Sequence, residues 1–199
     1  MNHIITISRE FGSGGRTVGK KVAEQLGIPC YDSELIQKIA EESGFAENYV
    51  KEAGEYTPGG FLASALSNRA FGPTNEDILW EIQCHVISEL AEKAPCVIVG
   101  RCADYVLRDD PNVALVNLFV HAPLAARIRR ESARTNTTPA EAEKRIRQVD
   151  KERAAYYNFF SSKRWGDAQA YDLCVNTDGL EISEVAKLVL RYLELRGLR

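Results

Sequence analysis

Short apolar segments alternate with helix-like segments along the chain. The segments expected to form strands are residues 3–8, 28–31, 94–100, 113–120 and 171–177. Between the first two, apolar residues recur at helical spacing at Val18, Val22 and Leu26, which predicts a helix with one buried face. The segment 94–100 is apolar almost throughout, so we expect a strand buried on both faces of a parallel sheet. This alternation predicts an α/β fold in which helices cover a parallel sheet.

Helix-start signals support the same division of the chain. Thr74, followed three residues later by Asp77, is a near capping box for a strongly patterned helix. Residues 138–141, Thr-Pro-Ala-Glu, combine a cap, a proline at the first helical position and a reciprocal glutamate, for a helix that runs to about Lys163. Asp32 is a candidate N-cap for another helix. Further helices are expected over residues 123–134 and 181–196.

Length and composition indicate one domain over residues 1–199. Hydrophobic residues make up 45% and charged residues 27% of the chain, as is ordinary for a globular protein. The 25 basic and 28 acidic residues leave a formal net charge of -3, so we expect neither nucleic acid nor a membrane as partner. No apolar run approaches the ~20 residues of a membrane span, and the N-terminal segment lacks a signal peptide's pattern. The oligomeric state is left open.

The cysteines also bear on where the protein works. They are scattered, odd in number and form no CxxC motif, which favours reduced thiols in the cytoplasm over a disulfide framework or a zinc site. They are Cys30, Cys84, Cys96, Cys102 and Cys174.

A glycine-rich turn joins the first strand to the first helix. The stretch over residues 7–27 reads ISREFGSGGRTVGKKVAEQLG. Backbone N–H groups and a helix N-terminus in such a turn suit a phosphate, and missing side chains let the backbone come close. Two alternatives are a tight turn without a ligand and a dinucleotide fingerprint, in which Thr17 would replace the third glycine.

The P-loop template G-x4-G-K-[S/T] fits this turn imperfectly in two registers. One register aligns Thr17 with the hydroxyl residue, Arg16 with the lysine and Glu10 with the first glycine. The other puts Gly15 in the place of the lysine and Arg9 at the first glycine. In either register the lysine is replaced, which is the main departure from a phosphate-binding loop.

Arg101 follows the apolar segment 94–100. The carboxyl ends of strands are where open α/β sheets bind ligands, and an arginine there can hold a phosphate through two hydrogen bonds. The alternative is a surface ion pair with Asp104 or Asp109.

A second group of arginines lies on the predicted helices over residues 127–153. Arg127, Arg130 and Arg134 share one helix face. Two such helices joined by a short polar turn would form a lid that closes over polyphosphate and excludes water. The alternative is a solvated helix hairpin with internal salt bridges.

Together these motifs resemble the cytidylate-kinase-like branch of the P-loop nucleoside monophosphate kinases. Residues 12–17, Gly-Ser-Gly-Gly-Arg-Thr, are similar to the G-x-G-K-G-T loop of bacterial cytidylate kinases, and Gly100-Arg101 is similar to their GRD after the central strand. Arg147, Asp150 and Arg153 resemble their R-D-x-x-D-x-x-R signature. The similarity covers residues 4–40 and 95–195. It implies a P-loop kinase-type three-layer fold with an arginine-bearing helical lid.

The resemblance also implies roles for individual residues. The amides of Gly12, Ser13, Gly14 and Gly15 would cradle the phosphates of the nucleotide. Arg16 would bind the nucleotide and neutralise charge, and Thr17 would meet Mg²⁺. Arg130, Arg134 and Arg153 would act with Arg16 in catalysis by closing over the transferred group. Asp32 and Arg101 would contact the acceptor, for which residues 44–90 are a probable helical excursion.

The function implied is transfer of the γ-phosphoryl group of ATP to a nucleoside monophosphate, with CMP or dCMP as the first expectation and Mg²⁺ as the cofactor. Small nucleotides are the partners expected. The alternative is a catalytically weak or inactive nucleotide-binding regulatory protein of the same fold, which the replaced lysine favours.

Overall fold

The computed structural model of the chain describes residues 2–53 and 74–198. The strands are β1 (Asn2–Arg9), β2 (Cys30–Tyr31), β3 (Cys96–Val99), β4 (Val113–His121) and β5 (Leu173–Asn176). The helices are α1 (Gly15–Leu26), α2 (Ser33–Ser43), α3 (Glu47–Ala53), α5 (Asn75–Lys93), α6 (Ala103–Val106), α7 (Leu124–Thr135), α8 (Pro139–Ser161), the short 3₁₀ helix η1 (Ala168–Ala170) and α9 (Ile182–Leu195). A strand or helix is found at each predicted place, but some bounds differ: the strand predicted over residues 28–31 is reduced to Cys30–Tyr31. The excursion predicted over residues 44–90 is described only in part, since residues 54–73 lie outside the described residues.

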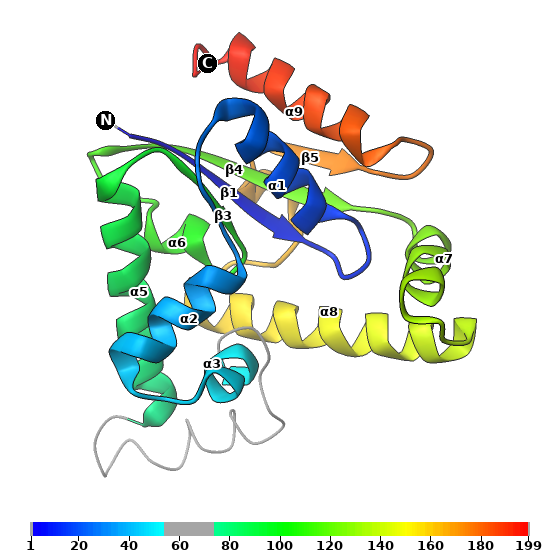
Figure 1. The fold of residues 1–199 in the computed structure, drawn as a ribbon, viewed down its shortest axis with the longest axis horizontal. Coiled ribbons are helices and arrows are strands. Elements are labelled where there is room, and N and C mark those ends of the chain that lie inside the picture. Colours follow the sequence, from blue (N-terminus) through cyan, green and yellow to red (C-terminus); the bar gives the residue numbers. More distant parts are fainter. Residues whose placement is uncertain (1, 54–73, 199) are drawn as a thin grey trace.

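The five strands form one sheet in the order β2-β3-β1-β4-β5, and every neighbouring pair is parallel (Figure 1). β1 is the middle strand: Ile7 lies opposite Val99 of β3 and opposite Leu118 of β4. Because parallel strands all point the same way, the carboxyl ends of β1, β3 and β4 meet at one edge of the sheet. The two ends of the chain lie near the opposite edge (Figure 1).

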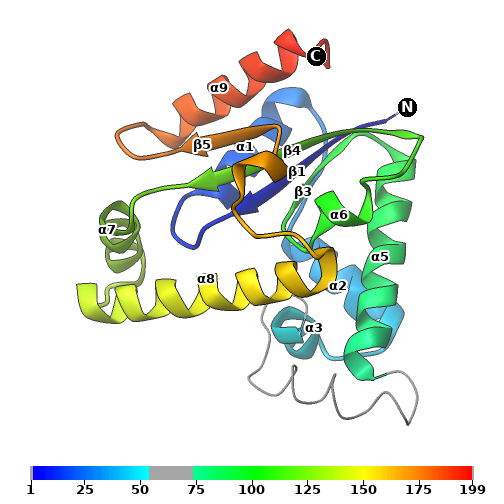
Figure 2. The same cartoon turned by 180° about the vertical axis from the view of Figure 1, so that it is seen from behind.

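Helices cover both faces of the sheet. α1 and α9 pack on one face, and α2, α5 and α6 pack on the other (Figures 1 and 2). Successive residues of β1 point to opposite faces, so Ile5 belongs to the core under α1 and α9 and Ile4 to the core under α2 and α5. All four residues of β3 are buried, as its apolar sequence predicted. None of the helices over residues 2–53 and 74–198 combines the length and apolar character of a membrane span.

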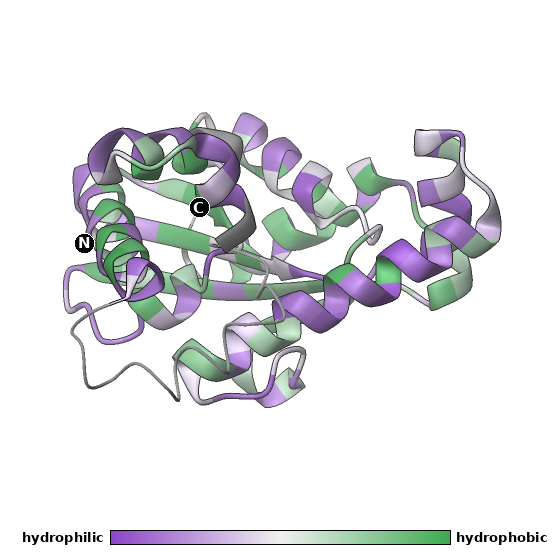
Figure 3. Ribbon diagram, turned by 90° about the horizontal axis from the view of Figure 1, so that it is seen from below, coloured by the Kyte–Doolittle hydropathy of each residue, from purple (hydrophilic) through white to green (hydrophobic). Residues whose placement is uncertain are grey.

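Helices α7 and α8 form an arm at the carboxyl edge of the sheet. α8 is 23 residues long, and its outer part is largely hydrophilic (Figure 3). Near its C-terminal end it buries Tyr156 and Tyr157, which pack with Cys102. The region predicted as a lid is therefore tethered through the aromatic end of α8.

Thr138 begins α8 with both hydrogen bonds of a capping box, as the sequence predicted. Its hydroxyl accepts from the Glu141 N–H at 3.3 Å, while the Glu141 carboxylate accepts from the Thr138 N–H at 2.9 Å. We expect Thr138→Ala to lower the free energy of unfolding by about 1 kcal/mol, measured by urea titration, because one helix-end donor loses its partner. Thr137→Ala is the matched control: its hydroxyl contacts only that of Thr135 among the described residues, so a change below about 0.5 kcal/mol is expected. Equal losses in both variants would contradict the capping role.

Candidate functional site

The loop between β1 and α1 lies at the carboxyl edge of the sheet (Figure 1). Gly12 and Gly14 have positive φ angles of 77° and 87°, which only glycine adopts without strain. The Ser13 hydroxyl donates to the Glu10 carbonyl at 2.8 Å, the Ser13 N–H donates to the same oxygen at 3.3 Å, and the Gly15 N–H donates to the Ser13 hydroxyl at 3.4 Å. Ser13 is fully buried, so these bonds brace the loop from inside.

Part of the predicted phosphate cradle is open to a ligand. The N–H groups of Gly12, Gly14 and Thr17 have no acceptor among residues 2–53 and 74–198. They lie at the N-terminus of α1, where unpaired N–H groups and the helix dipole favour an anion. The N–H groups of Ser13 and Gly15 were also predicted to point at phosphate, but here they bind oxygens of the loop itself.

Arg127 fixes the outer side of the loop. Its guanidinium donates to the carbonyls of Ala122 at 2.9 Å and Phe11 at 3.2 Å and forms ion pairs with Glu10 and Asp150. Asp150 in turn accepts from the Phe11 N–H at 2.7 Å. Arg127 is only 7% exposed. It therefore joins α7, α8, the end of β4 and the loop into one network, and it does not project toward a ligand.

Arg130 braces the inner side of the loop. Its guanidinium donates to the Ser13 carbonyl at 3.2 Å, and to the Thr177 hydroxyl at 2.7 Å and carbonyl at 2.6 Å. The Thr177 hydroxyl, fully buried, also donates to the Ser13 carbonyl at 2.7 Å. In this structure Arg130, predicted to close over the transferred group, holds the loop against the end of β5.

Arg101 lies where β3 ends, in a run of left-handed backbone. Gly100, Arg101 and Cys102 have φ angles of 79°, 60° and 52°. Such a conformation is strained for the two residues with side chains, and strain of this kind gathers at functional sites. The chain turns sharply here, and Arg101 is left 4% exposed.

The partners of Arg101 are all neutral. Its Nη1 donates to the Val50 carbonyl at 3.0 Å and to the Gln83 side-chain oxygen at 3.3 Å. Its Nη2 has no hydrogen-bond partner among residues 2–53 and 74–198. A buried charge without a carboxylate is costly, and an anion would satisfy it. The alternative of a surface ion pair with Asp104 or Asp109 is wrong, because Arg101 is buried and neither carboxylate contacts it.

A small cavity of about 30 Å³ lies beside Arg101. It is lined by Ser8, Arg9, Gly100, Arg101, Cys102, Arg153, Tyr156, Tyr157 and Trp165. The lining holds three arginines and no carboxylate. The volume suits a group the size of one water molecule, so a phosphate would enter only with a shift of side chains.

Arg16, at the end of the glycine loop, forms an ion pair with Asp32. Asp32 is the residue that was predicted to contact the acceptor. The Arg16 side chain is 56% exposed and does not line the small cavity. Asp32 precedes α2 as its N-cap residue but accepts no capping hydrogen bond. The two predicted site residues are thus brought together, on the outer side of the first turn of α1.

The predicted Mg²⁺ contact, Thr17, has an accessible side chain. Its side chain is exposed in the first turn of α1, beside the open N–H groups. Over residues 2–53 and 74–198, no three His, Cys, Asp or Glu residues gather around a possible ion. Mg²⁺ in kinases keeps water and phosphate oxygens and needs only one or two protein ligands, so a single hydroxyl here is compatible with it.

The remaining lid arginines differ in position. Arg153 of α8 lines the small cavity, and its Nη1 donates to the Arg9 carbonyl at 3.2 Å. Arg134 pairs with Glu131 through two hydrogen bonds and is largely exposed. Arg147 pairs with Glu143 on the surface of α8. The structure therefore brings Arg153, and not Arg134, to the cavity beside Arg101.

Asp104 is buried beside Tyr157, which lines the same cavity. Its carboxylate accepts from the Tyr157 hydroxyl at 2.6 Å, and burial raises its pKa even though this hydrogen bond acts in the opposite direction. The folded state therefore disfavours the ionised carboxylate of Asp104. This lowers the free energy of unfolding, but not at a pH below the pKa of the unfolded chain, about 3.9; the loss develops as the pH rises through the higher pKa of the folded state.

We therefore expect Asp104→Asn, which keeps an oxygen for Tyr157, to be more stable than the parent chain at pH 7. The difference should shrink toward pH 4, measured as urea midpoints across this range. A variant that is less stable at pH 7 would mean that the surrounding hydrogen bonds outweigh the cost of burial.

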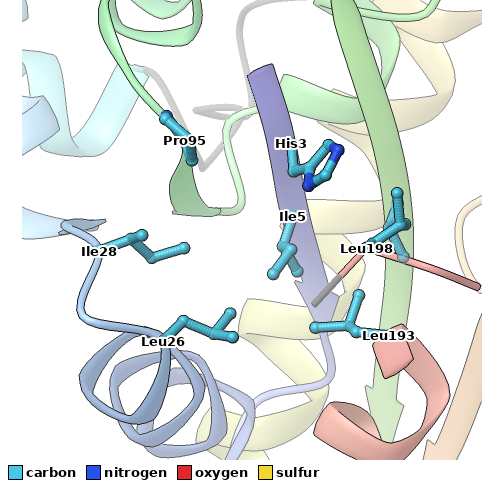
Figure 4. A pocket seen from close by; sticks show the side chains of 8 residues that line it. His3, Ile5, Leu26, Ile28, Pro95, Leu193 and Leu198 are labelled. Carbon is cyan, nitrogen blue, oxygen red and sulfur yellow. The ribbon is translucent and has the colours of Figure 1, made fainter. Parts of the chain in front are cut away.

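A larger cavity lies elsewhere. It measures about 230 Å³ and is found at the opposite edge of the sheet (Figure 4). Its lining is apolar except for His3: Ile5, Leu26, Ile28, Pro95, Val116, Leu193 and Leu198. With one polar side chain it offers nothing to hold a triphosphate, so the smaller, arginine-lined cavity is the better candidate site.

Several residues that shape the site had no clear signal in the sequence. Asp150 is marked in the sequence only as part of a motif, Thr177 only as the end of the last predicted strand, and Gln83 and Tyr157 carry no such mark. Each acts through a partner 18 or more positions away in the chain. Arg9 does stand out in the sequence, because in one register it replaces the first glycine of the P-loop template.

Known proteins similar to this chain include a cytidylate kinase, an uncharacterized protein and a shikimate kinase. A cytidylate kinase of Methanobrevibacter smithii is 27% identical over 194 residues, covering 96% of this chain and 99% of the relative. A solved structure of an uncharacterized protein from Eubacterium ventriosum is 28% identical with a TM-score of 0.74, covering 97% of this chain and 99% of the other. A shikimate kinase from Bacteroides thetaiotaomicron, 17% identical with a TM-score of 0.56 over 96% of this chain and 98% of its own, shares the P-loop kinase fold.

The family model described as cytidylate kinase-like family matches residues 4–179. This range begins in β1 and passes the end of β5, so it takes in residues of all five strands, the glycine loop and Arg101. On this match, the chain belongs to the cytidylate kinase-like family.

Proposed function

We propose that this chain transfers the γ-phosphoryl group of ATP to the phosphate of a nucleoside monophosphate, with CMP and dCMP as the first candidate acceptors. The family and the named cytidylate kinase support a nucleotide kinase. An oxygen of the acceptor's phosphate attacks the γ-phosphorus, the bond to the β–γ bridging oxygen breaks, and ADP leaves with that electron pair. The products are ADP and a nucleoside diphosphate.

The observation that carries the proposal is the buried guanidinium of Arg101, which has neutral partners and an unpaired Nη2. It lines the same small cavity as Arg9 and Arg153, beside the glycine loop. A phosphate dianion is the ligand that three converging arginines without a carboxylate would take. In the proposed arrangement Arg101 holds the acceptor's phosphate.

The donor nucleotide would lie across the loop. The N–H groups of Gly12, Gly14 and Thr17 would bind its phosphates, and the Thr17 hydroxyl would hold Mg²⁺, which supplies charge neutralisation when bound. Arg16 and Asp32 lie at the edge of this region, and Arg134 and Arg153 on the arm above it. No nucleophile from the protein is needed, since phosphoryl transfer depends on positioning and charge.

The test is a coupled assay for ADP release with Mg-ATP and CMP, dCMP, UMP, AMP or shikimate as acceptor. We expect activity with CMP or dCMP and none with shikimate. ATP at 100 times its Kd should also stabilise the fold by about 2.7 kcal/mol in thermal unfolding. ATP binding without ADP release on any nucleotide would favour the regulatory alternative, and no thermal shift would exclude nucleotide binding. A cytoplasmic location belongs to the same proposal and agrees with five cysteines that form no disulfide.

A further inference from the structure

Gly15 stands in the place of the P-loop lysine, and its backbone does not explain why it is a glycine. Gly12 and Gly14 have positive φ angles, but Gly15 does not. It is the first residue of α1, where other residues fit without strain. The reason for a glycine at this position must therefore be a neighbouring atom.

That neighbour is Arg9. A Cβ placed on Gly15 would lie 2.6 Å from the Arg9 Cβ, 3.2 Å from its Cγ and 3.1 Å from the Val120 Cβ. Real Cβ atoms essentially never approach another heavy atom to less than 3.0 Å. Arg9 and Val120 lie opposite each other on β1 and β4, so relief would need a shift of the sheet itself. The base of the Arg9 side chain thus fills the space from which a lysine at position 15 would start.

The two departures from the P-loop template are therefore linked: the positive charge missing at position 15 is found at position 9. In the register that puts Gly15 at the lysine, Arg9 falls on the first glycine, so a cation has been lost at one position and gained at the other. The two positions touch in space.

The surroundings of Arg9 fit a phosphate contact. Arg9 is 9% exposed and lines the small cavity together with Arg101 and Arg153. Arg16, the other cation of the loop, is mostly exposed, pairs with Asp32 and does not reach this cavity. Of the two, Arg9 lies between the loop and the arginine proposed for the acceptor.

We infer that Arg9 supplies the positive charge that the lysine supplies in an ordinary P-loop. Position 15 is then a glycine because the Arg9 side chain occupies the space that a Cβ would need. This inference rests on the proposed kinase function. Arg9 is then a catalytic residue: its planar guanidinium binds the oxygens of the γ-phosphoryl group as that group moves from the bridging oxygen of ADP to the acceptor's phosphate oxygen.

The first test is Arg9→Gln, which keeps the base of the side chain over Gly15 and removes the charge. We expect kcat with CMP to fall about 100-fold, with an unchanged circular dichroism spectrum, and Arg9→Lys to keep more activity than Arg9→Gln. The control is Arg191→Gln on the exposed face of α9, where the partner is Glu194 and activity should not change. A folded Arg9→Gln protein with kcat within twofold of the parent would overturn the inference, as would a 100-fold loss in Arg16→Gln alone.

The second test reverses the exchange. Arg9→Gly should be about as slow as Arg9→Gln, and Gly15→Lys alone should lower the melting temperature because of the contact with Arg9. The double variant Arg9→Gly, Gly15→Lys removes that contact and restores the ordinary template. It should be at least tenfold faster than Arg9→Gly, and a well-folded double variant no faster than Arg9→Gly would contradict the exchange.

A separate measurement distinguishes this inference from the proposed function. Should the parent chain phosphorylate no nucleotide, the kinase proposal fails, and Arg9 is then judged by calorimetry with ATP in place of turnover. An ATP Kd at least tenfold weaker in Arg9→Gln would still support its contact with the triphosphate. An unchanged Kd would overturn it.

Discussion

Replacing Arg101 by methionine is expected to lower kcat/KM for the acceptor nucleotide by about 10³-fold, or roughly 4 kcal/mol of transition-state stabilisation. The guanidinium is buried, its Nη1 is held by Val50 and Gln83, and its Nη2 has no partner among the described residues. It is therefore pre-positioned for an anion that enters the cavity. Methionine keeps much of the length and none of the charge.

The same substitution should leave the fold as stable as before or more stable. A buried guanidinium with only neutral partners costs desolvation that no carboxylate offsets, and an apolar side chain removes that cost. Unfolding in urea should thus give a midpoint at or above that of the parent chain. A loss of activity that comes with a large loss of stability would point to a structural role instead.

Two further variants sharpen this result. Arg101→Lys keeps the charge but not the fork of donors, so it should recover only part of the activity. Arg108→Met removes an arginine seven positions later, which stacks on Tyr105 at the surface and pairs with Asp109; it should change kcat/KM by less than twofold. Equal losses in Arg101→Met and Arg108→Met would contradict a specific contact with the acceptor.

The elements that the sequence predicted well are those set by local patterns. The capping boxes at Thr74 and Thr138 and the buried strand over residues 96–99 depend only on neighbours in the chain. The short β2 shows the limit of such patterns. Residues 28–31 were predicted as a strand, but only Cys30 and Tyr31 pair in register with β3, because Pro29 lacks an N–H and contributes only its carbonyl, to Val97.

The contacts around the predicted site residues could not be predicted from the sequence. Helical spacing correctly put Arg127, Arg130 and Arg134 near one face of α7, but spacing does not reveal what lies opposite that face. The partners of Arg127 are Glu10 and Asp150, which come from the first loop and from the next helix. Likewise the sequence showed two misfits to the P-loop template, and only the fold shows that they touch.

Replacing Arg127 by methionine is expected to lower the free energy of unfolding by about 3–5 kcal/mol, the second large effect. The side chain is buried between Glu10 and Asp150 and also supplies hydrogen bonds to the carbonyls of Phe11 and Ala122. Without it, two mostly buried carboxylates face each other with no cation between them. Urea titration with and without ATP measures the loss, and ATP affinity should fall as well, because the loop that carries Gly12 loses its outer support.

The matched control is Arg129→Met, two positions along the same helix. Arg129 is 70% exposed and pairs with Asp178 at the surface, so its removal should cost less than about 1 kcal/mol. Adding Asp150→Asn to Arg127→Met should recover part of the lost stability, since one of the uncompensated charges is then gone. If Arg127→Met is no less stable than Arg129→Met, or if the second substitution brings no recovery, the ion pairs do not hold the loop. Arg127 would then be available to a ligand, as the spacing of the three arginines first suggested.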